Sequence, residues 1–371
     1  MNRRIPELDG LRGVAIGLVL LYHYFYLTWN TPYVRCFALG WTGVDLFFVL
    51  SGFLIGGILL DARSAVNYFR VFYTRRFFRI VPLYLAVIVT FTALTYFLQR
   101  HYSQSFLDLG SGKSLPWWCY LTFTQNFAMA STERFGLAAL AVTWSLAVEE
   151  QFYLVLPLII RYVSRMRLIT VLKIGIYTAP LLRIALMIMF PHNWLAPWAL
   201  MPCRADALLL GVLAAIALRD PAWEQKLRKA NLGAIFGVLA VGMVGFTIFT
   251  PGVDNPVMQS LGYTWTALFY VCALVYALTR PAGWLSRGLR LAGLRWLGGL
   301  AYGVYLIHET VLDVLFGALR HHEPNITDGS ALLLSIAALA ITFIVAQASW
   351  KFFELPLIQR HRDEYRTEGA Q

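Results

Sequence analysis

An arginine and a histidine lie eleven residues apart near the start of the chain. Arg12 lies in LDGLRG, and His23 lies in the aromatic run YHYFY. Eleven residues turn an α-helix through three turns plus about 20°, so both side chains would share one face, roughly 16 Å apart along the axis. An imidazole can act as general base for an attacking hydroxyl, and a cation on the same face suits an anionic donor. The alternative is an interfacial arginine and a core histidine.

Two carboxylates are further candidates for this chemistry. Asp45 lies in the next apolar run, GVDLFFVLSGFLI, at a depth similar to that of His23 if the two helices are antiparallel. Its carboxylate could fix the tautomer of His23, although capping of its own helix is the alternative. Glu149 lies in WSLAVEEQFYL beside Glu150, and consecutive residues point about 100° apart, so one of them faces a given cavity. We predict as catalytic residues His23, Arg12, Asp45 and Glu149.

The second charged motif is RRFFRIVP, which contains Arg75, Arg76 and Arg79. In a helix these three side chains lie toward one side. Guanidinium groups bind phosphate through paired hydrogen bonds, and coenzyme A carries a 3′-phosphate and a pyrophosphate. Attraction to anionic lipid is the alternative interpretation. We predict that the three arginines bind an acyl-CoA.

The elements that must position these residues are membrane helices. Of the 371 residues 58% are hydrophobic and 14% are charged, with a mean hydropathy of +0.60. Apolar stretches recur that are long enough to cross a hydrocarbon core of about 30 Å. The predicted spans are 13–30, 42–60, 80–98, 137–160, 174–190, 198–218, 231–250, 258–279, 296–319 and 330–350. We predict an all-α, polytopic bundle of about ten transmembrane helices that forms one domain over residues 1–371.

The basic residues predict the orientation of this bundle. With the N-terminus in the cytoplasm, 24 of the 31 Lys and Arg residues lie in the inside segments and five lie outside. This asymmetry is the positive-inside pattern, so the net charge of +11 indicates contact with the lipid bilayer and not with nucleic acid. The four cysteines show no CxxC spacing, so we predict no metal site.

Seven motifs of the chain, in order, resemble those of membrane-bound acyltransferase family 3. They are PELDGLRGVAIGLVLLYHY, GVDLFFVLSGFLI, RRFFRIVPLY, WSLAVEEQFYL, RADALLLG, YGVYLIHE and FELP, and they extend from residue 6 to residue 356. Arg12 and His23 match the essential R-x10-H pair of that family. The arginine cluster and the segment around Glu149 match two further family motifs.

The resemblance implies an O-acyltransferase of the polysaccharide- or lipopolysaccharide-modifying type in a bacterial inner membrane. It would move an acyl group, most often acetyl, from cytoplasmic acyl-CoA to a hydroxyl of a carbohydrate or glycolipid, without a metal. Many relatives carry a C-terminal hydrolase-like domain of the SGNH type, which we expect this chain to lack.

Two questions of mechanism and function stay open at this stage. His23 can act as a general base in direct transfer, or it can carry the acyl group as an acyl-histidine intermediate. Buried charges also suit a proton-coupled exporter of a glycan or small molecule, although the sequence shows no related halves. A structural subunit is a third class, which leaves the aligned arginine and histidine unexplained.

Overall fold

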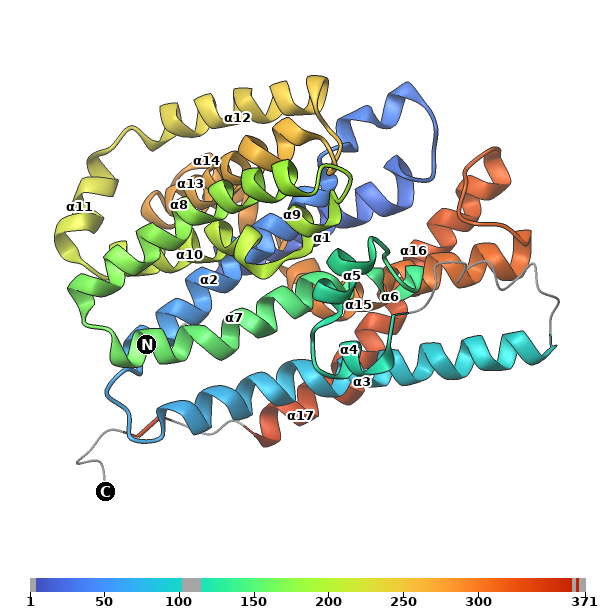
Figure 1. Cartoon of the computed structure of the whole chain (residues 1–371), viewed down its shortest axis with the longest axis horizontal. Coiled ribbons are helices and arrows are strands. Elements are labelled where there is room, and N and C mark those ends of the chain that lie inside the picture. The colour runs from blue at the N-terminus through green and yellow to red at the C-terminus, as the bar shows by residue number, and fades with distance from the viewer. Residues whose placement is uncertain (1–4, 102–114, 362–364, 367–371) are drawn as a thin grey trace.

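The computed structural model describes residues 5–101, 115–361 and 365–366, and these ranges contain helices and loops but no strand. The longer helices are α1 (Pro6–Leu21), α2 (Gly43–Asp61), α3 (Tyr68–His101), α7 (Thr143–Tyr162), α8 (Arg165–Met189), α10 (Met201–Ala217), α12 (Leu232–Phe249), α13 (Tyr263–Thr279), α15 (Ala292–Arg320) and α16 (Gly329–Ser349). The shorter ones are α4 (Trp117–Leu121), α5 (Gln125–Thr132), α6 (Ala138–Ala141), α9 (Leu195–Ala199), α11 (Pro221–Lys229), α14 (Trp284–Leu289) and α17 (Leu355–Arg360). In Figure 1, α12 and α3 lie on opposite sides of the view, with α2, α7 and α15 between them.

Nine helical segments in the described part of the chain are long and apolar enough to cross a membrane. They are Pro32–Asp61, Tyr68–Leu94, Ala139–Tyr162, Arg165–Met189, Leu195–Ala217, Leu232–Phe249, Met258–Thr279, Ala292–Arg320 and Gly329–Arg360. Each corresponds to one predicted span. The prediction of an all-α polytopic membrane bundle is therefore confirmed.

The first predicted span, 13–30, differs from the others. The chain forms α1 and continues directly into a π-helical turn, η1 (Tyr22–Tyr26), and the described part of this region does not meet the length and hydropathy of a span. Its first turn carries the buried carboxylates of Glu7 and Asp9. Arg290 pairs with Glu7, and Arg12 donates to Asp9 at 3.0 Å. The helix is polar because its partners are protein groups in the bundle interior.

Glycines fix the position of α1 against α15. A Cβ atom at Gly298 would overlap the carbonyl of Asp9, and one at Gly13 would overlap the carbonyl of Leu294. The two backbones can therefore approach this closely because both residues lack a side chain. The two helices run parallel with an offset of about 285 residues, so this register carries His23 to the level of His308.

Two short helices, α4 and α5, lie in the connection between α3 and α7. Their polar side chains face the bundle: the amide of Gln125 donates to the Thr143 carbonyl at 2.8 Å, and that of Asn126 donates to the Ala199 carbonyl at 3.2 Å. These bonds tie the segment to the start of α7 and the end of α9.

Candidate active site

Two histidines and a glutamate form a cluster where η1 meets α15. His23 Nε2 lies 2.9 Å from Glu309 Oε1, and His23 Nδ1 lies 3.4 Å from His308 Nε2. His23 belongs to the π-helical turn, a local widening of the helix that is frequent at functional sites. The register set by Gly13 and Gly298 therefore brings together ionisable groups that are far apart in the sequence.

Backbone carbonyls determine which ring nitrogens carry protons. The Nδ1 atom of His308 lies 2.7 Å from the Tyr305 carbonyl, and that of His23 lies 2.9 Å from the Val19 carbonyl. A carbonyl only accepts, so both Nδ1 atoms donate. The Nε2 atom of His23 then faces the Glu309 carboxylate, where it can bind a proton in an ion pair. The arrangement suits a base whose protonated form is stabilised by a neighbouring carboxylate.

The same three residues offer ligand atoms that lie within 4.8 Å of one another, which is close enough for a metal ion. The hydrogen bonds to Val19 and Tyr305 account for both Nδ1 atoms without an ion. The absence of a metal from the chemistry stays a prediction.

This cluster lines a cavity of about 440 Å³, which we call the histidine cavity. Its wall combines acidic and aromatic groups: Glu309 and Asp313 lie on α15, while Trp144 and Trp198 lie opposite. Their rings are 4.0 Å apart between centroids. The cavity is large enough for a small polar substrate group and has apolar rings to exclude water from it.

A second cavity, of about 260 Å³, is lined by Arg12, Arg76 and Arg79, and we call it the arginine cavity. Arg76 and Arg79 form no ion pair with a carboxylate in the described ranges, and Arg79 is exposed. Two positive groups without a partner in the chain attract an anionic ligand.

Glu149 lies in the arginine cavity and not beside His23. The Tyr153 hydroxyl donates to Glu149 Oε2 at 3.2 Å and lies 2.5 Å from the Ser51 hydroxyl. Ser51, Tyr153 and Glu149 therefore form one hydrogen-bonded group in the wall of this cavity. Glu149 thus lines the arginine cavity and does not contact His23, in contrast to a direct role at His23.

The two cavities adjoin. Both are lined by Val44 and by Tyr305. The Tyr305 hydroxyl donates to the Val142 carbonyl at 3.0 Å and lies 2.6 Å from the Ser145 hydroxyl. A tyrosine held by these bonds separates the arginine cavity from the histidine cavity, and a substrate that reaches both must pass this ring.

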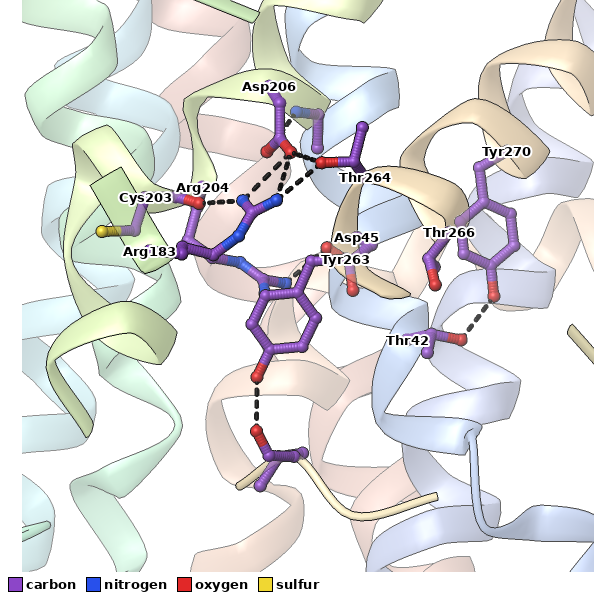
Figure 2. A network of polar contacts seen from close by, with 12 residues as sticks. Thr42, Asp45, Arg183, Cys203, Arg204, Asp206, Tyr263, Thr264, Thr266 and Tyr270 are labelled. Carbon is purple, nitrogen blue, oxygen red and sulfur yellow. Dashed lines mark hydrogen bonds and ion pairs between the residues drawn. The ribbon is translucent and has the colours of Figure 1, made fainter. Parts of the chain in front are cut away.

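Asp45 is not where the sequence interpretation placed it. It pairs with Arg204 in the buried network of Figure 2, while Arg183 donates to Asp206 Oδ2 at 3.0 Å and to Thr264 at 2.6 Å. The sequence predicts that Asp45 lies near His23, because the two residues lie at a similar depth in the membrane. Depth does not determine the direction of a side chain, and that of Asp45 points toward α10. The carboxylate at His23 is Glu309, so we withdraw the assignment of Asp45 as the orienting group.

Arg75 also departs from the prediction. The lining of the arginine cavity includes Arg76 and Arg79 but not Arg75, whose guanidinium lies 5.2 Å above the Tyr365 ring. Arg75 and Arg76 point about 100° apart on the helix, so they do not share a target.

The predicted catalytic residues did not include two members of the cluster, His308 and Glu309. The signal that could have found them is their position inside an apolar run, where an ionisable group costs at least about 2.5 kcal/mol unless it has a function or a partner.

Comparison with known proteins finds relatives that match nearly the whole chain. The peptidoglycan O-acetyltransferase OatA of Listeria monocytogenes is 27% identical over 373 residues, which cover 96% of this chain and 56% of that protein. The O-acetyltransferase OatA of Staphylococcus aureus is 25% identical over 378 residues, covering 96% of this chain and 57% of that protein. The chain thus spans little more than half the length of these relatives. No solved structure shows a significant match.

A family model for an acyltransferase domain matches residues 5–351, nearly the whole chain. The match includes Arg12, His23, the arginines of the arginine cavity and Glu309. The chain belongs to this acyltransferase family.

Proposed function

We propose that this protein is a membrane O-acyltransferase that moves an acetyl group from acetyl-CoA to a hydroxyl of a carbohydrate-type acceptor. The observation that carries the proposal is the pair of adjoining cavities, one lined by Arg12, Arg76 and Arg79 and one by the His23–Glu309 pair. Similarity to O-acetyltransferases of peptidoglycan supports a carbohydrate acceptor.

The donor fits the arginine cavity. Its volume of about 260 Å³ is below the roughly 300–1,000 Å³ of common ligand pockets, so it cannot enclose a whole coenzyme A. The phosphates would stay at the exposed Arg79, and the pantetheine arm with its thioester would extend past Arg12 toward Tyr305. The positive-inside pattern puts the arginine cavity on the cytoplasmic side, where acyl-CoA is found.

The acceptor hydroxyl would enter the histidine cavity and react with the thioester beside Tyr305. Its oxygen bonds to the carbonyl carbon as its proton moves to the His23–Glu309 pair, whose Nε2 and Oε1 atoms lie 2.9 Å apart and share the positive charge that the pair gains. The carbon–sulfur bond then breaks, and the proton passes to the coenzyme A thiolate. In the acyl-histidine alternative His23 attacks the thioester first, and the acceptor hydroxyl displaces it in a second step.

The test uses the purified protein in lipid nanodiscs with radiolabelled acetyl-CoA. As acceptor it uses surface glycan from the producing cells, freed of O-acetyl groups by mild base. We expect wild type to label the glycan and His23→Ala to lose at least about 100-fold in rate. His192→Ala, at an exposed histidine, serves as the matched control and keeps the wild-type rate.

Labelled glycan formed equally well by His23→Ala would refute this mechanism. A wild-type protein that never labels glycan, but moves unmodified glycan across vesicles, would favour the exporter alternative. A label that stays on the protein, and is lost in His23→Ala, would favour the acyl-histidine route.

A further inference from the structure

A third cavity, of about 1,110 Å³, lies between the end of η1 and the loop that follows α15. We call it the loop groove. Its lining comes from two segments, 26–35 and 322–327: Tyr26, Leu27, Thr28, Trp29, Asn30, Thr31, Pro32, Val34, Arg35, His322, Glu323, Pro324, Asn325 and Thr327. These segments continue the two elements that carry His23 and Glu309.

Hydrogen bonds hold the two walls of the loop groove together. The backbone N–H of Ile326 donates to the Thr28 carbonyl at 2.7 Å, and the Thr28 hydroxyl donates to the Tyr24 carbonyl at 2.6 Å. Ile326 and Thr28 are buried. His321 ends α15 in the left-handed conformation, with φ of 59°, which turns the chain back toward Thr28. The groove is therefore a fixed part of the fold.

The loop groove is continuous with the histidine cavity. Both are lined by Leu27, Thr28, Glu323 and Pro324. The rings of Tyr22 and Tyr26 stack with centroids 5.3 Å apart, with Tyr22 in the histidine cavity and Tyr26 in the groove. A chain-like ligand lying in the groove could thus place one end next to His23.

The lining has the chemistry of a carbohydrate site. Among the described residues, the indole N–H of Trp29 and the side-chain amides of Asn30 and Asn325 form no hydrogen bond, so they are available to a ligand. Amides bind sugar hydroxyls as donor and acceptor, and aromatic rings cover the apolar faces of sugar rings. Arg35 and Glu323 carry opposite charges, which argues against a polyanion.

We propose that the loop groove binds a saccharide chain and presents one of its hydroxyls to His23. This inference rests on the proposed function and assigns its acceptor to a place in the fold. The volume exceeds the roughly 300–1,000 Å³ of common small-molecule sites, so the groove has room for more than one sugar ring. The ligand class is an oligosaccharide segment without strong net charge.

The experiment measures acceptor length and affinity together. The de-O-acetylated surface glycan is cleaved and separated into fragments of one to six sugar units, and transfer from radiolabelled acetyl-CoA is measured in nanodiscs. For wild type we expect the KM of the acceptor to fall as fragments lengthen. For Trp29→Ala and Asn325→Ala we expect the KM of long fragments to rise about tenfold, with an unchanged KM for acetyl-CoA.

The chain provides a matched control on the same wall. Tyr33 is 86% exposed and does not belong to the groove lining, so Tyr33→Ala should match wild type. Trp29→Phe keeps a ring and should recover most of the affinity.

Three outcomes would overturn the inference. If wild type transfers acetyl but both groove variants match Tyr33→Ala, the groove does not bind the acceptor. If the groove variants fail in cells but act normally on free fragments, the groove holds a protein partner instead. If wild type labels no fragment, the proposed function itself fails, and this inference fails with it.

Discussion

Arginines occur in two contrasting regions of this protein. Arg183 and Arg204 are completely buried, and each has an aspartate partner: Asp206 at 3.0 Å for Arg183, and Asp45 for Arg204 (Figure 2). In the arginine cavity, Arg76 and Arg79 have no such partner in the ranges that the structure describes.

The difference shows how to separate structural from functional charges in a membrane protein. A buried charge is costly, so a fold that encloses one supplies its counter-ion, as α2 and α10 do here. A charge that has no counter-ion among the described residues lies where a ligand can supply one. Residue type alone does not distinguish these cases, but partner and exposure do.

The largest effect should come from breaking the buried network. Arg204→Met leaves the Asp45 carboxylate buried without a partner, which costs about 3–5 kcal/mol, so we expect a strongly lowered melting temperature in detergent. The double variant Arg204→Met/Asp45→Leu removes both charges and should recover most of this loss. A single variant as stable as wild type would contradict the comparison.

The double variant also decides a question of mechanism. If it folds and transfers acetyl groups, Asp45 has a structural role, as its ion pair with Arg204 indicates. If it folds but is inactive, the original prediction of Asp45 as a catalytic residue regains support.

In the arginine cavity, loss of charge should weaken the affinity for the donor and leave the stability of the fold unchanged. Arg76→Gln/Arg79→Gln removes the two groups that we propose bind phosphate, and charged hydrogen bonds contribute about 1.5–3 kcal/mol each, so the KM for acetyl-CoA should rise at least about 100-fold. The melting temperature should stay near that of wild type. Arg75→Gln is the matched control, since Arg75 lies over Tyr365, and it should leave KM nearly unchanged.

Much of the fold and part of the candidate site could be predicted from the sequence, because apolar length and helix periodicity can be recognised within a short stretch of residues. Apolar length identified nine spans, and helix periodicity aligned Arg12 with His23 toward cavities that adjoin. The rotation of one helix relative to another, in contrast, depends on contacts between residues that are far apart in the sequence. Asp45 and Glu309 both lie at a plausible depth, and the close approach of α1 and α15 at Gly13 and Gly298 decides which of them reaches His23.

The partners of the buried carboxylates in α1 could not be predicted, for a related reason. Composition reports how much of a helix is apolar, but not whether its polar residues meet lipid or protein. Glu7 and Asp9 are buried against arginines that only the folded bundle brings near.

Tyr305 lies between the two functional cavities and should show an intermediate effect. Tyr305→Phe keeps the ring and removes the hydrogen bonds to Val142 and Ser145, so transfer should fall about fivefold, as expected for a neutral bond of about 1 kcal/mol. Tyr305→Ala removes the ring that separates the cavities, so acetyl-CoA hydrolysis without acceptor should rise several-fold over wild type. A Tyr305→Ala protein with wild-type hydrolysis would show that the ring is not the barrier.

The smallest effect on stability is expected for an arginine that has an acidic partner but is also exposed to solvent. Arg219 binds Asp61 through two bonds, Nε to Oδ1 at 2.7 Å and a terminal nitrogen to Oδ2 at 2.8 Å, yet the Asp61 side chain is 63% exposed. Water solvates either charge when the other is removed, so Asp61→Asn should change the free energy of unfolding by less than about 1 kcal/mol. Melting at low and high salt checks this, because any difference should shrink as ions screen the pair. A loss as large as that of Arg204→Met would mean that geometry, and not burial, sets the importance of an arginine pair in this fold.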